Sequence, residues 1–202
     1  MKFIKENSYD IVKFFIYQIG IAVFSLAVAI PLDTAINDEN TGKLTQLGVS
    51  VLAIAFYCIL VYTVSWEQGA TDRIRIDSGR MTPTPTKGIK IALLANIPNF
   101  IISAVAILSS LLFRDGNVWT SVLAIALAIL GLFESMYLGV VEFIVYGIDN
   151  TTMLFYLVKS VAFLLLPFIT VIAAHIGYIL GDKNKKIFGF ITDKKKTDSG
   201  NK

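Results

Sequence analysis

Glu134 and Glu142 are the residues best suited to chemistry, because both carboxyl groups interrupt a long apolar run, Val118 to Ile148. Ionisable side chains at membrane depth are costly and mark a functional site by default. On one continuous helix, residues eight apart lie roughly 80° apart in projection, loosely on one face. The pair could bind a cation or a proton in a cavity at a helix break. The alternative is that the break lies at the membrane interface and both carboxylates are simply hydrated.

Three further polar side chains could complete such a pocket. Tyr137 stands three residues after Glu134, and two asparagines flank Pro98. The asparagines have a structural alternative, because they could bond across helices or cover the carbonyls that Pro98 leaves free. The candidate ligand- or ion-binding residues are therefore Glu134, Glu142, Tyr137, Asn96 and Asn99.

Metal and cofactor chemistry has no support in the sequence. His175 is the only histidine and Cys58 the only cysteine, so a His cluster, a Cys-based metal site and an internal disulfide are all excluded. His175 and Lys159 are expected to be structural, with Lys159 reaching toward the interface. There is no phosphate-binding glycine loop, no His-Glu-x-x-His and no Gly-x-Ser-x-Gly. We predict no cofactor, no metal and no catalytic residue. An intramembrane enzyme built on both glutamates and His175 is the least favoured function.

Composition identifies the elements that must position these residues. The chain of 202 residues is 55% hydrophobic and only 16% charged, whereas soluble domains are about a quarter charged. We therefore predict an all-α, polytopic transmembrane helix bundle. Residues 1–181 form a single membrane domain and residues 182–202 a basic tail.

Five strong hydrophobic segments follow one another along the chain. They cover roughly residues 14–32, 47–65, 89–113, 118–148 and 153–180. Pro98 should kink the third segment, because proline removes a helical hydrogen bond. The first could instead belong to a cleaved signal peptide in residues 1–29, ending in the small residues Ala27-Val28-Ala29. An uncleaved span is favoured, because the apolar run is long and Pro31 crowds the cleavage site.

The fourth segment is too long for one span. As a single helix, residues 118–148 would measure roughly 46 Å, and fitting it into the bilayer would need a tilt near 50°, beyond the usual range. The segment must therefore protrude, lie partly in the interface, or break. The candidate break points are Gly131, Glu134, Gly139 and Gly147. Two half-depth passes, Val118 to Phe133 and Met136 to Ile148, would give six passes in all; the alternative is five plus a re-entrant or interfacial arm.

Basic residues predict the orientation. The polar stretch 65–90 carries five basic residues, and three lysines precede the first hydrophobic segment. The last 22 residues contain seven lysines. The loop near residues 33–43 is acidic instead. Because Lys and Arg stay on the cytoplasmic side, we expect the N-terminus, stretch 65–90 and the C-terminus to be cytoplasmic. Within this stretch, "RIRID" alternates with period two and should lie extended or shallowly on the membrane.

The basic segments are the candidate contact surfaces. Loop 66–90 and the tail could bind anionic lipid or a cytoplasmic protein, although a merely solvated tail is an equal alternative. Nucleic-acid binding has no support beyond bulk charge. The candidate contact residues are Arg73, Arg75, Arg80, Lys194, Lys195 and Lys196. Gly177 and Gly181, four apart, form a small-residue pair that would let two helices approach closely.

Three stretches carry a resemblance: "IKENSYDIVKFFIYQIGIAVFSL", "WEQGATDRIRIDSGR" continuing to "GIKIALLANIPN", and "HIGYILG" before the lysines. Together they resemble small multi-span membrane proteins of Gram-positive bacteria for which no activity is known. The resemblance implies a bacterial plasma-membrane location and transfers no functional residue. We expect a non-enzymatic small permease or membrane subunit of a transport complex. The alternative is an accessory or scaffold protein that recruits a cytoplasmic partner.

Overall fold

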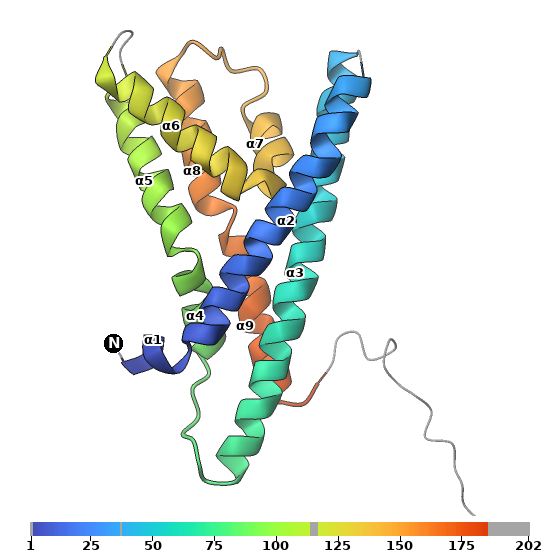
Figure 1. The fold of residues 1–202 in the computed structure, drawn as a ribbon, viewed down its shortest axis with the longest axis vertical. Coiled ribbons are helices and arrows are strands. Elements are labelled where there is room, and N and C mark those ends of the chain that lie inside the picture. Colours follow the sequence, from blue (N-terminus) through green and yellow to red (C-terminus); the bar gives the residue numbers. More distant parts are fainter. Residues whose placement is uncertain (1, 37, 114–116, 186–202) are drawn as a thin grey trace, which may run out of the picture.

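The structure, a computed structural model, describes residues 2–36, 38–113 and 117–185. Every regular element in these ranges is helical (Figure 1), which confirms the all-α prediction. In this part of the chain, three helices are long and apolar enough to cross a membrane, or up to five if each of two sharply bent helix pairs is one span. The apolar helices fit a membrane protein. The predicted contact residues Lys194, Lys195 and Lys196 lie outside the described residues.

The helices are joined by short connections. They are α1 (Lys2–Glu6), α2 (Ser8–Ala35), α3 (Glu39–Asp77), α4 (Lys87–Ala95), α5 (Ile97–Leu111), α6 (Val118–Phe133), the 3-10 turn η1 (Ser135–Tyr137), α7 (Leu138–Ile144), α8 (Met153–Leu165) and α9 (Phe168–Asp182).

The prediction for "RIRID" was wrong, because α3 stays helical as far as Asp77. Charge pairs at helical spacing support the helix here: Arg73 Nε lies 3.0 Å from Asp77 Oδ1, and Arg75 Nη1 lies 3.6 Å from Asp72 Oδ1. Ile74 is 71% exposed, so the alternating isoleucines do not form a buried strand-like face. Loop 66–90 is therefore mostly helix, and only residues 78–86 connect α3 to α4.

The third hydrophobic segment bends close to Pro98, as predicted. α4 and α5 meet at Asn96 with an angle of 55°. Pro98 occupies the first turn of α5, where a missing amide hydrogen is tolerated because first-turn amides have no helical partner. The proline thus separates two helices rather than weakening one.

The fourth segment breaks at Glu134, one of the four predicted break points. α6 ends at Phe133, η1 follows, and the chain then leaves at 88° to α6. In Figure 1, α6 runs from the top of the bundle toward its middle, and α7 turns back toward the top. We call this pair of arms, residues 118–144, the hairpin. Its arms correspond to the two half-depth passes predicted.

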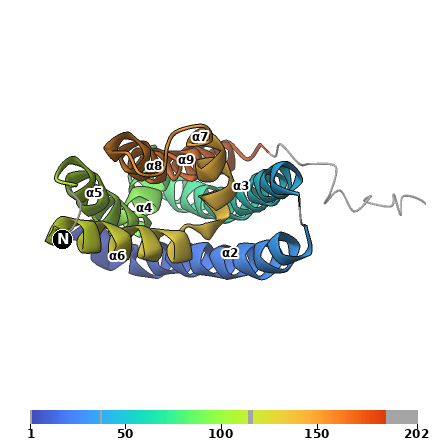
Figure 2. The same cartoon turned by 90° about the horizontal axis from the view of Figure 1, so that it is seen from above.

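The connections gather at two ends of the bundle (Figure 1). One end holds α1, residues 78–86 and the last turn of α9, and we call it the α1 end. The other holds the connection between α2 and α3 and residues 145–152, and we call it the hairpin end. Seen from above, α6 lies along α2, while α7, α8 and α9 lie on the other side of the bundle (Figure 2).

Helices α3 and α9 approach until their backbones almost touch. A Cβ added to Gly181 would lie 2.0 Å from the Trp66 carbonyl oxygen, and one on Gly177 would lie 2.4 Å from that of Tyr62. Gly69 on α3 faces the backbone of α9 in the same way. The predicted small-residue pair is therefore a site of close helix packing.

Asp38 caps α3, and its protonation should weaken the fold. Its carboxylate accepts hydrogen bonds from the Thr41 amide, at 2.8 Å, and from the Thr41 hydroxyl. These bonds hold the pKa of Asp38 below its ordinary value of 3.8. A lowered folded-state pKa contributes stability above the unfolded-state value, and this contribution is lost as pH falls through the folded-state value. We expect Asp38→Ala to lower the melting temperature in detergent at neutral pH, and the difference from wild type to shrink below pH 3.8. A difference that is constant with pH would contradict this role.

Candidate functional site

The tip of the hairpin, residues 134–137, buries a carboxyl group that has no hydrogen-bond partner in the described part of the chain. Glu134 is 0% exposed. Its backbone is satisfied, because its amide donates to the Leu130 carbonyl at 2.7 Å and its carbonyl accepts from the Tyr137 amide at 2.8 Å. Neither carboxyl oxygen has a hydrogen-bond partner among the described residues. A group buried in this way is unusual, since buried polar atoms are nearly always satisfied.

Hydrogen bonds from α2 and α3 hold the tip in place. Ser135 Oγ donates to the Ala22 carbonyl at 2.6 Å, and Ser25 Oγ donates back to the Ser135 carbonyl at 3.3 Å. The Gly139 amide donates to Ser50 Oγ at 2.8 Å. A side chain at Gly139 would meet the backbone of α3, with a Cβ 2.1 Å from the Gln46 carbonyl oxygen. The position of Glu134 is therefore set by two neighbouring helices as well as by its own.

Other buried polar groups surround Glu134. Tyr137 is 0% exposed, and its hydroxyl lies close to the Thr170 side chain on α9. Tyr57, on α3, interacts electrostatically with both Glu134 and Tyr137. Its hydroxyl makes only a long, 3.5 Å hydrogen bond to the Phe14 carbonyl. The structure thus brings together Glu134 and Tyr137, two of the predicted candidates, and adds a second phenol that the sequence analysis missed.

Gln18, on α2, is the second polar residue that the sequence analysis missed. It is 1% exposed, and neither polar atom of its side chain has a partner in the described part of the chain. Gln18 lies one turn from Phe14, which contacts Tyr57, and one turn from Ala22, which contacts Ser135. Residues four apart share a helix face, so Gln18 is on the face of α2 turned toward the tip. The sequence did indicate this residue, because its amide side chain stands alone in the middle of an apolar segment.

Glu142 does not join Glu134. The break separates the two carboxyl groups, whereas the sequence analysis had considered a shared face on a continuous helix. Glu142 is 35% exposed, and its Oε1 lies 2.5 Å from Lys159 Nζ on α8. The expectation that Lys159 reaches toward the interface was incomplete, because Lys159 bonds to a specific carboxylate. Glu142 therefore already has the cation that Glu134 lacks.

Asn96 and Asn99 serve the bend between α4 and α5. Asn96 Nδ2 donates to the Ala92 carbonyl at 2.9 Å, and Asn99 Nδ2 donates to Asn96 Oδ1 at 3.3 Å. Both residues are buried, at 3% and 1% exposure. Their amides bond to the nearby backbone and to each other at the break, in local contacts rather than across the bundle.

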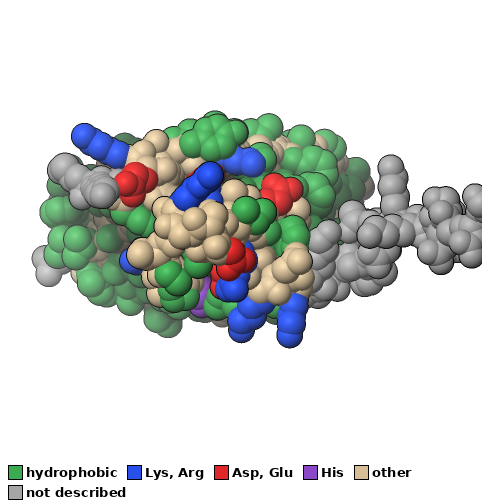
Figure 3. All heavy atoms as spheres, turned by 90° about the horizontal axis from the view of Figure 1, so that it is seen from below, with side chains coloured by type: hydrophobic (Ala, Val, Ile, Leu, Met, Phe, Trp, Pro, Cys, Tyr) green, Lys and Arg blue, Asp and Glu red, His purple; other side chains and the backbone are tan. Residues whose placement is uncertain are grey.

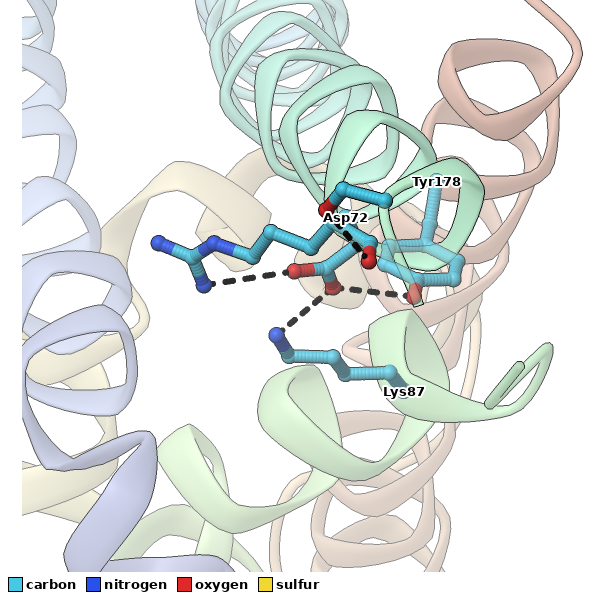
Figure 4. A network of polar contacts seen from close by, with 5 residues as sticks. Asp72, Lys87 and Tyr178 are labelled. Atoms are coloured by element: carbon cyan, nitrogen blue, oxygen red, sulfur yellow. Dashed lines mark hydrogen bonds and ion pairs between the residues drawn. The ribbon is translucent and has the colours of Figure 1, made fainter. Parts of the chain in front are cut away.

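The α1 end carries a second buried polar group, centred on Asp72. This carboxylate is 2% exposed and accepts hydrogen bonds from Lys87 Nζ at 2.7 Å and from the Tyr178 hydroxyl at 3.0 Å (Figure 4). Arg75 lies beside it on α3. The network joins α3, α4 and α9. Its groups are paired with one another, which makes it a structural clamp.

Charged side chains gather on the surface of this end. Figure 3 shows Lys, Arg, Asp and Glu side chains over it, with apolar side chains around them. Among the predicted contact residues, Arg73, Arg75 and Arg80 are exposed. His175 is half-buried, and its Nδ1 has no partner in the described ranges. No three His, Cys, Asp or Glu side chains of the described residues gather as a metal-binding set.

Comparison of the chain with protein-family models, with curated proteins and with solved structures found no match.

Proposed function

We propose that the protein is a multi-pass protein of the bacterial plasma membrane whose termini are both cytoplasmic. In this arrangement α2, α3, the pair α4–α5 and the run α8–α9 cross the bilayer, and the hairpin enters it from the outer side and returns. Support comes from charge, because Lys and Arg concentrate on the cytoplasmic side of membrane proteins. At the α1 end, five basic residues lie between the last turns of α3 and the first turns of α4, and the N-terminal segment adds three lysines.

The function that we propose is small-cation binding at Glu134, in a non-enzymatic permease or the membrane subunit of a transport complex. The observation that carries this proposal is the Glu134 carboxyl group at the tip of the hairpin, which is 0% exposed and has no hydrogen-bond partner among the described residues. A buried carboxyl group is stable only as the neutral acid or beside a cation or hydrogen-bond donor. Transporters commonly place their sites where helices are interrupted near the midplane, and the proposed arrangement puts the tip of the hairpin at such an interruption.

The neighbouring side chains support a cation or a protonated amine as the ligand. Glu134 supplies negative charge, Gln18 a carbonyl oxygen, and Tyr57 and Tyr137 hydroxyl oxygens. The tyrosine rings also offer π faces to an organic ammonium group. No lysine or arginine of the described chain forms an ion pair with Glu134, so the site has no built-in counter-ion.

Glu134→Gln should abolish reaction of the purified protein with dicyclohexylcarbodiimide, which modifies carboxyl groups in apolar surroundings. In the wild type we expect a single major adduct at Glu134, located by peptide mass spectrometry. One of three probes, Na⁺, K⁺ or methylammonium, should slow its formation several-fold, because an ion bound at the carboxyl group shields it.

Glu142→Gln is the matched control, because Glu142 is paired and half-exposed. This variant should keep both the adduct at Glu134 and its protection by the same cation. An adduct at Glu134 that none of the three cations slows, or no adduct there, would contradict the proposal.

An accessory or scaffold role is the second candidate function. The observation that favours it is the last part of α3, which presents Arg73 and Arg75 with side chains 51% and 58% exposed. Such a protein would recruit a cytoplasmic partner through this surface and would not need the buried carboxyl group. Cation protection at Glu134 therefore separates the two functions, because a scaffold gives no reason for it.

A further inference from the structure

A cavity of about 590 Å³ opens at the hairpin end of the bundle. Its walls come from the start of α3 on one side and from α7, the following turn and the first residues of α8 on the other. Leu138 and Glu142 line it from the hairpin, Asp38 and Gln46 from α3 and its cap, and Tyr146 and Phe155 from the rim. The volume is within the range of small-molecule sites.

The walls of this cavity already hold ammonium groups. Lys159 Nζ lies 2.5 Å from the Glu142 carboxylate and 5.5 Å from the centre of the Phe155 ring. Lys43 Nζ lies 4.5 Å from the centre of the Tyr146 ring. Together with the carboxylates of Asp38 and Glu142, these two ammonium groups leave the cavity wall without a net charge, and the ring faces of Tyr146 and Phe155 can attract a small cation.

Leu138 is the first residue of α7, and of the residues that line this cavity it is the nearest in sequence to the tip of the hairpin. It lines the cavity, and its Cδ1 also lies 3.6 Å from where a Cβ on Gly131 would be, in the angle between the two arms. In sequence it is four residues after Glu134, with the 3-10 turn η1 between them. One apolar side chain thus touches both the cavity and the arm that ends in the buried carboxyl group.

We infer that the cavity is the path by which a small cation reaches Glu134, and that Leu138 is the gate at its inner end. The inference rests on the proposed function, since it concerns access to the same carboxyl group. It also assigns a side: the path opens at the hairpin end, opposite the basic α1 end. Leu138 is a gating residue here and does not bind the cation itself.

Accessibility of a cysteine at position 134 tests the path directly. Cys58 is the only native cysteine, so Glu134→Cys with Cys58→Ser leaves one thiol to follow by intact mass. The probe is 2-aminoethyl methanethiosulfonate, a small cationic thiol reagent. Adding Leu138→Ala should raise the modification rate several-fold, and Leu138→Trp should lower it several-fold.

Leu130→Ala is the matched control, because Leu130 is likewise four residues from Glu134 in sequence, but is 0% exposed and does not line the cavity. It should leave the rate nearly unchanged. Sidedness is a second measurement that needs no change at Leu138. In proteoliposomes of known orientation, free cysteine on one side of the membrane consumes the reagent on that side. Modification of position 134 should continue when the free cysteine is on the side of the α1 end, and should stop when it is on the side of the hairpin end.

Three results would overturn the inference: equal rates in Leu138→Ala and Leu130→Ala, modification only from the α1 end, or no modification in any variant. Each leaves the carbodiimide test of Glu134 independent. A cation-protected adduct without dependence on Leu138 would keep the proposed function and remove the path. Modification that depends on Leu138, without protection of Glu134 by any cation, would keep the path and remove the proposed function.

Discussion

Asp72→Ala is expected to lower the free energy of unfolding by about 3–5 kcal/mol, which is typical for removing one partner of a buried ion pair. Its carboxylate binds Lys87 Nζ at 2.7 Å, and the Lys87 side chain is itself only 9% exposed. The substitution leaves that ammonium group buried without a counter-ion and frees the Tyr178 hydroxyl. Equilibrium unfolding of the purified protein in mixed micelles of dodecyl maltoside and dodecyl sulfate measures the change.

Arg73→Ala is the matched control for this prediction. It removes a helical ion pair with Asp77 whose side chains are 51% and 59% exposed, and exposed pairs contribute only about 0–1 kcal/mol. The two residues are neighbours in sequence and differ mainly in burial. Equal losses in both variants would mean that the Asp72 network does not hold the ends of α3, α4 and α9 together.

Gly181→Ala should cost about 3 kcal/mol, the upper end of the usual range for overpacking. The added methyl group would lie 2.0 Å from the Trp66 carbonyl oxygen and 3.0 Å from the Ala70 backbone nitrogen. Both obstacles are backbone, so no side chain can move aside and the two helices must separate. Unfolding in the same mixed micelles gives the free-energy change.

Gly48→Ala, on α3, is the control for which no loss of stability is expected. A Cβ at Gly48 meets nothing within 4 Å, and alanine is favoured over glycine in a helix by up to about 1 kcal/mol. This variant should be unchanged or more stable. If both glycine variants lose stability equally, close packing of α3 on α9 is not the reason for Gly181.

The breaks in the helices were predictable because they follow from length and from backbone chemistry. Pro98 lacks an amide hydrogen, and residues 118–148 are too long to cross a bilayer as one helix. Both statements are local, so no knowledge of neighbouring helices was needed. The chain bends at Asn96, two residues before Pro98, and at Glu134, one of the four candidate break points.

Two predictions, for Lys159 and for "RIRID", missed for different reasons, because the deciding partner of Lys159 lies on another helix whereas those of "RIRID" lie on the same one. Nothing in the sequence near Lys159 indicates that it bonds to Glu142. The alternation in "RIRID" suggested an extended segment, but charge pairs four and three residues apart support a helix there. An alternation over only five residues is a weak signal, and the charge spacing in the same residues favours the helix.

The list of residues at the candidate site was also incomplete. Glu134 and Tyr137 could be chosen because they are close in sequence and stand in an apolar run. Gln18 and Tyr57 come from helices α2 and α3, more than 70 residues earlier in the chain. Their burial beside the hairpin tip depends on how the tip inserts between helices, and a single sequence does not encode that in any local pattern.

Composition, span lengths and the placement of Lys and Arg are properties of the chain alone, since each residue partitions between oil and water largely independently of the others. That is why the sequence sufficed for the all-helical class, for the breaks and for an expected orientation. The separation of Glu142, which has a lysine partner, from Glu134, which has none, arises only in the folded bundle. It depends on distances between helices, and those are set by backbone approach at glycines such as Gly139 and Gly181.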